Sequence, residues 1–262
     1  GQIAESSRVD NYPGIPGIDG YSLGEKFREH AESLGVEFTE AQVLSLGQKD
    51  GIWIIGCDED ITLESKAVIY ATGCKNRPLG VPGEEKYYGR GLSFCAVCDG
   101  AFYKGKRVAV IGGGDTALDD AMYLSDICEK VYLVHRREFF RGSASTLEKL
   151  KQKENVEIIV NARVEEITGD KKIDGIILDN KTKLNISGLF AAVGMIPQTE
   201  LLKEFGVLDE SNYVKASEDT KTTVNGLFAA GDVRTKQLRQ VVTAAADGAN
   251  AIYSVMEYLR NI

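Results

Sequence analysis

Two cysteines, Cys95 and Cys98, stand two residues apart, and an acid, Asp99, directly follows the second. This spacing suits either half of a zinc site or a pair of thiols that is oxidised and reduced as a unit. A structural zinc site needs four ligands, usually from a second such pair or from two histidines. The chain offers neither, since its other cysteines are dispersed and its two histidines are far apart in sequence. We therefore predict no metal site and a redox-active pair, in which Asp99 protonates a departing thiolate.

A glycine loop, GGGDTA at residues 112–117, fits the pattern G-x-G-x-x-A. It follows an apolar stretch at residues 108–111 that is typical of a buried strand, and it opens a predicted helix. Gly112 permits a tight turn, Gly114 lets backbone amides approach a pyrophosphate, and Ala117 allows the helix to pack closely on the strand. The pattern favours a dinucleotide-binding loop; a glycine-rich connector without a ligand is the alternative.

Three arginines, Arg136, Arg137 and Arg141, lie at and just beyond the end of the next predicted strand. NAD-binding domains usually carry an acid about 20 residues beyond the glycine loop, where it holds the ribose 2′-hydroxyl. Guanidinium groups at this place suit a 2′-phosphate instead. We therefore predict NADP rather than NAD, the alternative being a basic strand end that faces solvent.

Alternating strands and helices must position these residues. Apolar runs predict strands at residues 66–73, 106–112 and 131–137, the first two of which end in glycine, and helices are expected within 113–126, at 146–154 and at 241–262. The segments 188–194, GLFAAVG, and 226–232, GLFAAGD, are near copies. Such an echo is expected if two related dinucleotide-binding domains each contain the same kind of strand, although an apolar pentamer can also recur by chance.

Composition limits the remaining classes. A chain of 262 residues is long enough for two modest domains, and its net charge of −8 disfavours nucleic acid or an anionic membrane as partner. No apolar run approaches the roughly 20 residues that span a bilayer, and residues 1–14 have no pattern of a signal peptide. Five cysteines with one close pair indicate a reducing, cytoplasmic compartment. In such a compartment we expect Cys57, Cys74 and Cys128 to be ordinary buried thiols.

Four motifs in this order, CAVCDG, GGGDTA, HRREFFR and FAAGDV, closely resemble the low-molecular-weight bacterial thioredoxin reductases. The resemblance runs over essentially the whole chain and includes YATG at residues 70–73 and LRQVVTAAADG at 238–248. It implies an α/β protein with two Rossmann-like, three-layer dinucleotide-binding domains. An FAD domain of residues 1–78 and 212–262 would be discontinuous, with an NADPH domain of residues 79–211 inserted into it.

The same resemblance implies the cofactors, the partner and the site. Hydride would pass from NADPH to FAD, and electrons would then pass to the Cys95–Cys98 disulfide and to a thioredoxin-like protein, with the NADPH domain swivelling between the two half-reactions. A homodimer is the habit of the family. The NADPH contacts would be Gly112, Gly114, Thr116, Arg136, Arg137 and Arg141. The FAD contacts would be Gly1, Gln2, Asn11, Thr72, Gly73, Asp232, Val233, Arg239, Gln240 and Val241.

One departure concerns the start of the sequence. The family begins with a strand and a G-x-G-x-x-G loop for the FAD pyrophosphate, and residue 1 lies beyond both, so that roughly 40 residues of a first βαβ unit are lacking. We favour a longer chain, because a true fragment would expose an unpaired sheet edge. The alternatives are a truncated, flavin-free NADP-binding module and a related reductase with another thiol partner. A ferredoxin-driven relative would not need the three arginines.

Overall fold

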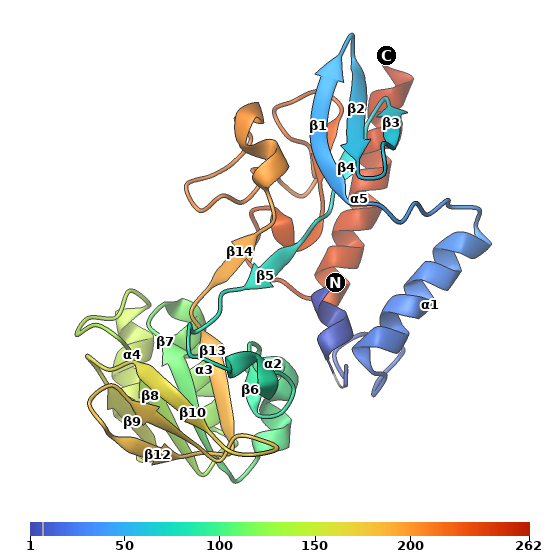
Figure 1. The fold of residues 1–262 in the computed structure, drawn as a ribbon. Coiled ribbons are helices and arrows are strands. Elements are labelled where there is room, and N and C mark those ends of the chain that lie inside the picture. Colours follow the sequence, from blue (N-terminus) through green and yellow to red (C-terminus); the bar gives the residue numbers. More distant parts are fainter. Residues whose placement is uncertain (7) are drawn as a thin grey trace. The chain divides into compact units, whose positions relative to one another are not determined.

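The computed structural model describes residues 1–6 and 8–262, which form two compact units (Figure 1). Unit 1 consists of Gly1–Ala4, Tyr12–Lys75 and Met195–Ile262, and unit 2 of Glu5–Asn11 and Asn76–Gly194. The chain leaves unit 1, forms most of unit 2 and returns. Residues 195–211, which the sequence prediction grouped with the inserted domain, lie in unit 1.

Unit 2 is built on a parallel sheet of five strands in the order β6-β13-β7-β8-β9. The strands are β6 (Leu92–Ser93), β7 (Arg107–Gly112), β8 (Lys130–Val134), β9 (Val156–Ile159) and β13 (Gly188–Ala192). Helices α3 (Asp115–Ser125) and α4 (Ala144–Lys151) connect β7 to β8 and β8 to β9. Because successive side chains of a strand point to opposite faces, Val108 and Val110 of β7 pack with the helices.

The opposite face of the same sheet carries a second, antiparallel sheet. Its strands are β10 (Val164–Thr168), β11 (Gly175–Leu178) and β12 (Lys183–Asn185). Ala109 and Ile111 of β7 pack here with Ile167, Ile176 and Leu184. Helices, parallel sheet and antiparallel sheet therefore form three layers with two apolar cores, which confirms the predicted fold class for this unit.

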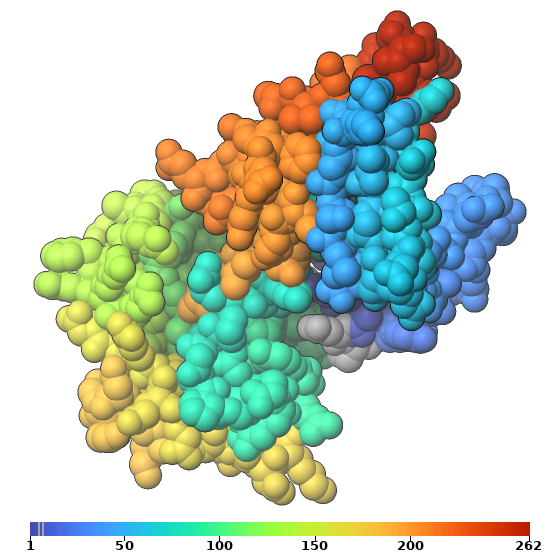
Figure 2. Space-filling view, turned by 45° about the horizontal axis from the view of Figure 1, so that its top comes forward, coloured from blue at the N-terminus to red at the C-terminus, as the bar shows by residue number. Residues whose placement is uncertain are grey.

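Unit 1 contains a parallel pair, β4 (Val68–Tyr70) with β15 (Leu227–Ala229), and an antiparallel sheet of β1 (Val43–Lys49), β2 (Ile52–Cys57) and β3 (Thr62–Ser65). Its long helices are α1 (Gly20–Ser33) and α5 (Val241–Arg260). Strand β1 packs beside the 3₁₀ segment η4 (Glu200–Phe205), and the two form one continuous surface (Figure 2). Trp53 is fully buried in the core, together with Leu202 and Leu227.

The near-copied segments take equivalent positions in the two units. Residues 188–192 form β13, which pairs in parallel with β7, and residues 227–229 form β15, which pairs in parallel with β4. The predicted helices are also present, as α3, α4 and α5. The predicted strand at 66–73 is shorter in the structure, because the chain leaves β4 after Tyr70 and pairs again only as β5 (Cys74–Asn76), with β14 (Met195–Pro197).

The described part of the chain holds no helix with both the length and the apolar character needed to cross a membrane.

Candidate active site

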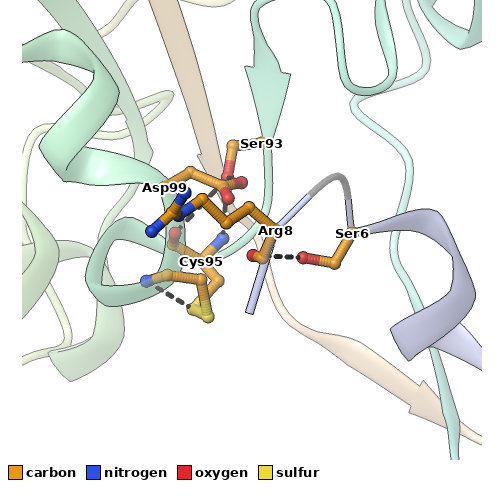
Figure 3. Close-up of a disulfide and its surroundings, with 6 residues drawn as sticks. Ser6, Arg8, Ser93, Cys95 and Asp99 are labelled. Carbon is orange, nitrogen blue, oxygen red and sulfur yellow. Dashed lines mark hydrogen bonds between the residues drawn. A yellow bond between two sulfur atoms is a disulfide. The ribbon is translucent and has the colours of Figure 1, made fainter. Parts of the chain in front are cut away.

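Cys95 and Cys98 form a disulfide in unit 2, with their Cα atoms 5.3 Å apart (Figure 3). The short strand β6 ends at Ser93, and the one-turn helix α2 (Ala96–Asp99) begins directly after Cys95. Ala96 is fully buried against the α3 side of the core, and this packing fixes the turn. The backbone N–H of Cys98 donates to Cys95 Sγ at 3.2 Å, so a negative charge that develops on this sulfur has a donor already in place.

Asp99 lies beside the disulfide, and its surroundings favour the protonated form of its carboxyl group. Its Oδ2 accepts a hydrogen bond of 2.6 Å from the hydroxyl of Ser93, and this hydroxyl oxygen accepts one of 3.1 Å from the backbone N–H of Cys95 (Figure 3). Burial raises the pKa of Asp99, and the bond from Ser93 offsets this only in part. Ser93 thus links the acid to the disulfide backbone, a contact that the sequence did not reveal.

The three remaining cysteines are free thiols. Cys74 and Cys128 are buried as predicted, and burial raises the pKa of each thiol to about 11, which keeps both protonated and unreactive. The prediction is wrong for Cys57, which is half-buried because it ends β2 near the turn into β3.

The glycine loop of unit 2 is shaped by close packing at its first two residues. A Cβ atom on Gly112 would lie 2.4 Å from Ala192 O, and one on Gly113 would lie 2.2 Å from the His135 ring. Gly114 differs, because a Cβ there would meet nothing within 4 Å. Gly114 precedes α3 as its N-cap residue, so the open space lies at the helix N-terminus, where phosphates are favoured. Ala117 is fully buried against the strand, as its place in the pattern predicts.

His135 is a site residue that the motif reading missed. Its ring is buried, lies under Gly113, stacks at 4.8 Å on Phe140, and makes a 3.2 Å hydrogen bond through Nε2 with Phe139 O. The backbone N–H of Arg141 in turn donates to Gly113 O at 2.7 Å. The glycine loop and the arginine-bearing loop are therefore packed as one body. The sequence pointed to His135 only through its place in the motif HRREFFR, and that motif drew attention to the charged arginines rather than to the histidine ring.

The three predicted arginines, Arg136, Arg137 and Arg141, are exposed on this body. None of their guanidinium groups forms an ion pair with a described residue. Thr116 is exposed in the first turn of α3. Three exposed cations that form no ion pair within the described part of the chain thus share one packed body with the open N-terminus of α3, and this combination suits a ligand with several phosphates.

A second group of predicted residues comes together in unit 1. Thr72 donates to Gln198 O at 2.6 Å, and the backbone N–H of Gln198 donates to Gly73 O at 3.0 Å. The next residue, Cys74, donates from Sγ to Asp232 O at 3.0 Å, and Arg239 Nε donates to the same oxygen at 3.2 Å. Residues 72–74 and 232–239, far apart in sequence, therefore share one hydrogen-bonded cluster.

The side chain of Asp232 is the unsatisfied member of this cluster. Its Oδ1 is buried and has no hydrogen-bond partner among the described residues. Burial raises its pKa, although Lys236 and Arg239 act in the opposite direction. A buried acceptor without a donor is costly, so this oxygen is suited to a ligand hydroxyl. FAD carries such hydroxyl groups on its ribityl chain, and the residues present therefore fit this cofactor.

The other predicted FAD contacts are not part of the hydrogen bonds described above for the cluster around Asp232. Val233 is buried at the end of the 3₁₀ turn η5 (Gly231–Val233), and Gln240 and Val241 begin α5, where Gln240 and Thr243 form a capping box. Gly1 and Gln2 lie at the start of unit 1, with Gln2 in the turn η1 (Gln2–Glu5). Asn11 lies in the short segment Glu5–Asn11 that belongs to unit 2.

Comparison with known proteins gives one consistent result. Residues 3–248 match the pyridine nucleotide-disulphide oxidoreductase family. The thioredoxin reductase of Helicobacter pylori strain J99 is 40% identical over 273 residues, covering 100% of this chain and 88% of that protein. The thioredoxin reductase of Bacillus subtilis strain 168 is 36% identical and covered to 84%. The crystal structure of thioredoxin reductase from Streptococcus pyogenes has a TM-score of 0.92 at 37% identity, covering 100% of this chain and 87% of that one.

Proposed function

Because the chain belongs to the thioredoxin reductases of the pyridine nucleotide-disulphide oxidoreductase family, we infer that it is an NADPH-dependent flavoprotein that reduces the disulfide of thioredoxin. The observation that carries this function is the Cys95–Cys98 disulfide with the buried carboxyl of Asp99 beside it. The pair lies in the same unit as the glycine loop and the three exposed arginines.

The disulfide and Asp99 divide the thiol chemistry between them. Two electrons break the Cys95–Cys98 bond and leave one thiolate and one thiol once a proton is added. The raised pKa of Asp99 lets its carboxyl group supply that proton, and the hydrogen bond from Ser93 holds this group in place. The backbone N–H of Cys98 stabilises negative charge on Cys95 Sγ. One cysteine then attacks the thioredoxin disulfide to form a mixed disulfide, and the other attacks this bond, which releases reduced thioredoxin and restores the pair.

Unit 2 supports NADPH binding through its glycine loop and its cations. Gly112 lets the loop pack closely against Ala192 and Ala117, Gly114 leaves room for the pyrophosphate, and Thr116 stands in the first turn of α3. We assign the 2′-phosphate to Arg136, Arg137 and Arg141, because a phosphate accepts paired hydrogen bonds from guanidinium groups.

Unit 1 supports FAD binding through the cluster around Asp232. Bound FAD supplies the two-electron chemistry that links NADPH to the disulfide. The residues assigned to hold it are Gly1, Gln2, Asn11, Thr72, Gly73, Asp232, Val233, Arg239, Gln240 and Val241. The unpaired Asp232 Oδ1 supports this assignment most directly.

We further propose a homodimer located in the cytoplasm. Helix α5 exposes a stripe of apolar side chains, Ile252, Tyr253, Met256 and Leu259, which would be covered by a second copy. Sedimentation of the holoenzyme as a monomer would contradict this part of the proposal. The three free thiols accord with a reducing compartment, and cell fractionation tests the location.

The test of the function is Cys98→Ser in the full-length enzyme. We expect visible flavin absorption that anaerobic NADPH bleaches as in the wild type, together with loss of thioredoxin reduction by at least about 1,000-fold, since one sulfur cannot complete the exchange. Cys57→Ser, at a half-buried free thiol, is the matched control and should retain activity. Unchanged thioredoxin reduction by Cys98→Ser would refute the role of the pair. A wild type that takes up no FAD would refute the flavoprotein assignment.

A further inference from the structure

Unit 1 contains a buried ion cluster whose contacts the sequence did not indicate, although its central residue, Asp247, lies within the motif LRQVVTAAADG. Asp247, in the second turn of α5, is 2% exposed, and so is Arg234, which follows the η5 turn. Asp247 Oδ1 accepts 2.6 Å from Arg234 Nη2, and Asp247 Oδ2 accepts 2.8 Å from both Arg234 Nε and Lys236 Nζ. A bidentate arginine and a lysine therefore converge on one carboxylate.

The cluster is joined to the backbone that carries Asp232. Asp247 Oδ2 also accepts a 2.8 Å hydrogen bond from the N–H of Gly231, the residue directly before Asp232. Gly231 has φ +77°, a left-handed conformation that favours glycine. Arg234, on the other side of the η5 turn, is held by the same carboxylate. Asp247 thus fixes both ends of the turn from which the Asp232 side chain projects.

Charge in the cluster is unbalanced in a direction that matters for Asp232. Two buried cations, Arg234 and Lys236, face the single buried carboxylate of Asp247, while the second partner of Arg234, Glu218, has an 87% exposed side chain. Burial raises the pKa of Asp232, and the positive charge of Lys236 acts in the opposite direction without reversing this effect. Buried ions are expensive unless they are paired and hydrogen-bonded. The three buried ions Asp247, Arg234 and Lys236 adjoin the turn that carries the unpaired Asp232 oxygen, and we attribute their cost to the need to hold this turn for a ligand.

We propose that Asp247 is a positioning residue for FAD: through Arg234, Lys236 and Gly231 N–H it holds the Gly231–Val233 turn so that the free Asp232 oxygen is presented to the flavin nucleotide. This rests on the proposed function, because it presumes that unit 1 binds FAD. Asp247 itself acts through the turn and is not assigned a contact with the cofactor.

The main test compares two carboxylates of the same helix in the full-length enzyme. Asp247→Asn keeps an oxygen for Gly231 N–H and removes the charge that holds Arg234 and Lys236. We expect FAD to dissociate at least tenfold more readily, with a shifted visible absorption band and a shifted flavin midpoint potential. Glu257→Gln is the matched control, since Glu257 pairs with Lys221 on the surface of α5 at 2.6 Å, and it should keep FAD affinity within twofold. Wild-type affinity and spectrum in Asp247→Asn would overturn the proposal.

Two further measurements cover the case in which Asp247→Asn does not fold. The double variant Asp247→Asn with Lys236→Gln removes one charge of each sign; it should fold yet bind FAD at least tenfold more weakly, and wild-type FAD affinity in it would overturn the proposal. In wild-type apoprotein, amide exchange across residues 229–234 should already be slow, because the turn is fixed before FAD arrives. Exchange there at the rate of an open loop would equally overturn the proposal. A wild type that binds no FAD would instead refute the proposed function.

Discussion

The two turns assigned to the cofactors are built in opposite ways. In unit 2 the glycine loop after β7 is shaped by the absence of side chains and by the buried ring of His135, which packs against Gly113. In unit 1 the turn after β15 is shaped by buried charges, with Asp247, Arg234 and Lys236 in contact behind it. One turn is fixed by steric packing and the other by ion pairs, although both follow a strand of a parallel pair or sheet.

The difference also concerns where the free charges lie. Arg136, Arg137 and Arg141 of unit 2 are exposed and make no ion pair with described residues, so their attraction remains available to a ligand. In unit 1, Arg234 and Lys236 are paired with Asp247. The group that remains available to a ligand there is Asp232 Oδ1, which has no hydrogen-bond partner among the described residues. Unit 2 is thus suited to an additional phosphate, and unit 1 to a hydroxyl group.

Among the variants that test this comparison of the two turns, the largest effect is expected from the exposed arginines of unit 2. Arg136→Ala combined with Arg137→Ala should weaken NADPH binding at least about 100-fold, since each charge-assisted hydrogen bond contributes about 1.5–3 kcal/mol. NADH binding should change less than about threefold, because NADH has no 2′-phosphate. Titration of the full-length enzyme with both cofactors measures this. Arg163→Ala, at another exposed arginine of unit 2, serves as the control, and equal losses for NADPH and NADH would refute the 2′-phosphate assignment.

The sequence predicted one turn better than the other for a physical reason. Steric demands leave a local signature: GGGDTA after an apolar strand already indicates the loop in unit 2, and its strand, helix and Ala117 contact are confirmed. The cysteine pair and Asp99 were likewise adjacent in sequence. The unit 1 cluster depends on a tertiary contact between residues 231–236 and Asp247, which lies in the second turn of α5, and no spacing rule connects them.

Burial is the second quantity that the sequence did not determine. His135 reads as one more basic residue in HRREFFR, yet the fold places its ring inside the unit while Arg136 and Arg137 face solvent. Ser93 reads as an ordinary polar residue and is in fact the link between Asp99 and the backbone of Cys95. In both cases the end of a strand determines which side chain points inward. Side chains alternate between the two faces, so an error of one residue in a predicted strand boundary reverses which side chain is expected to be buried.

A smaller effect is expected when single methyl groups are added to the glycine loop. Gly114→Ala should weaken NADPH about tenfold and leave stability nearly unchanged, because its Cβ would occupy the open space at the N-terminus of α3. Gly113→Ala should instead lower the free energy of unfolding by about 1–3 kcal/mol through overpacking against His135. NADPH titration and thermal unfolding of both variants separate the two effects. Similar behaviour of the two variants would contradict the division of the loop into a packed part and a ligand-facing part.

The smallest effect is the pH response that distinguishes a steric turn from an ionic one. Burial lowers the pKa of His135, the bond with Phe139 O partly restores it, and the neighbouring arginines lower it again. The folded-state pKa therefore lies below the unfolded value of about 6.5, so the unfolded chain takes up more protons and the fold loses stability as pH falls through that value. Between pH 7.5 and 5.5 the wild type should lose on the order of 2 °C more in melting temperature than His135→Gln, whose amide still donates to Phe139 O. His30→Gln, at the exposed histidine, is the control.

The unit 1 ion cluster should not respond in this pH range, because the bonds from Arg234 and Lys236 outweigh burial and lower the pKa of Asp247. Equal pH responses of the wild type and His135→Gln would show that a neutral His135 ring does not support the glycine loop.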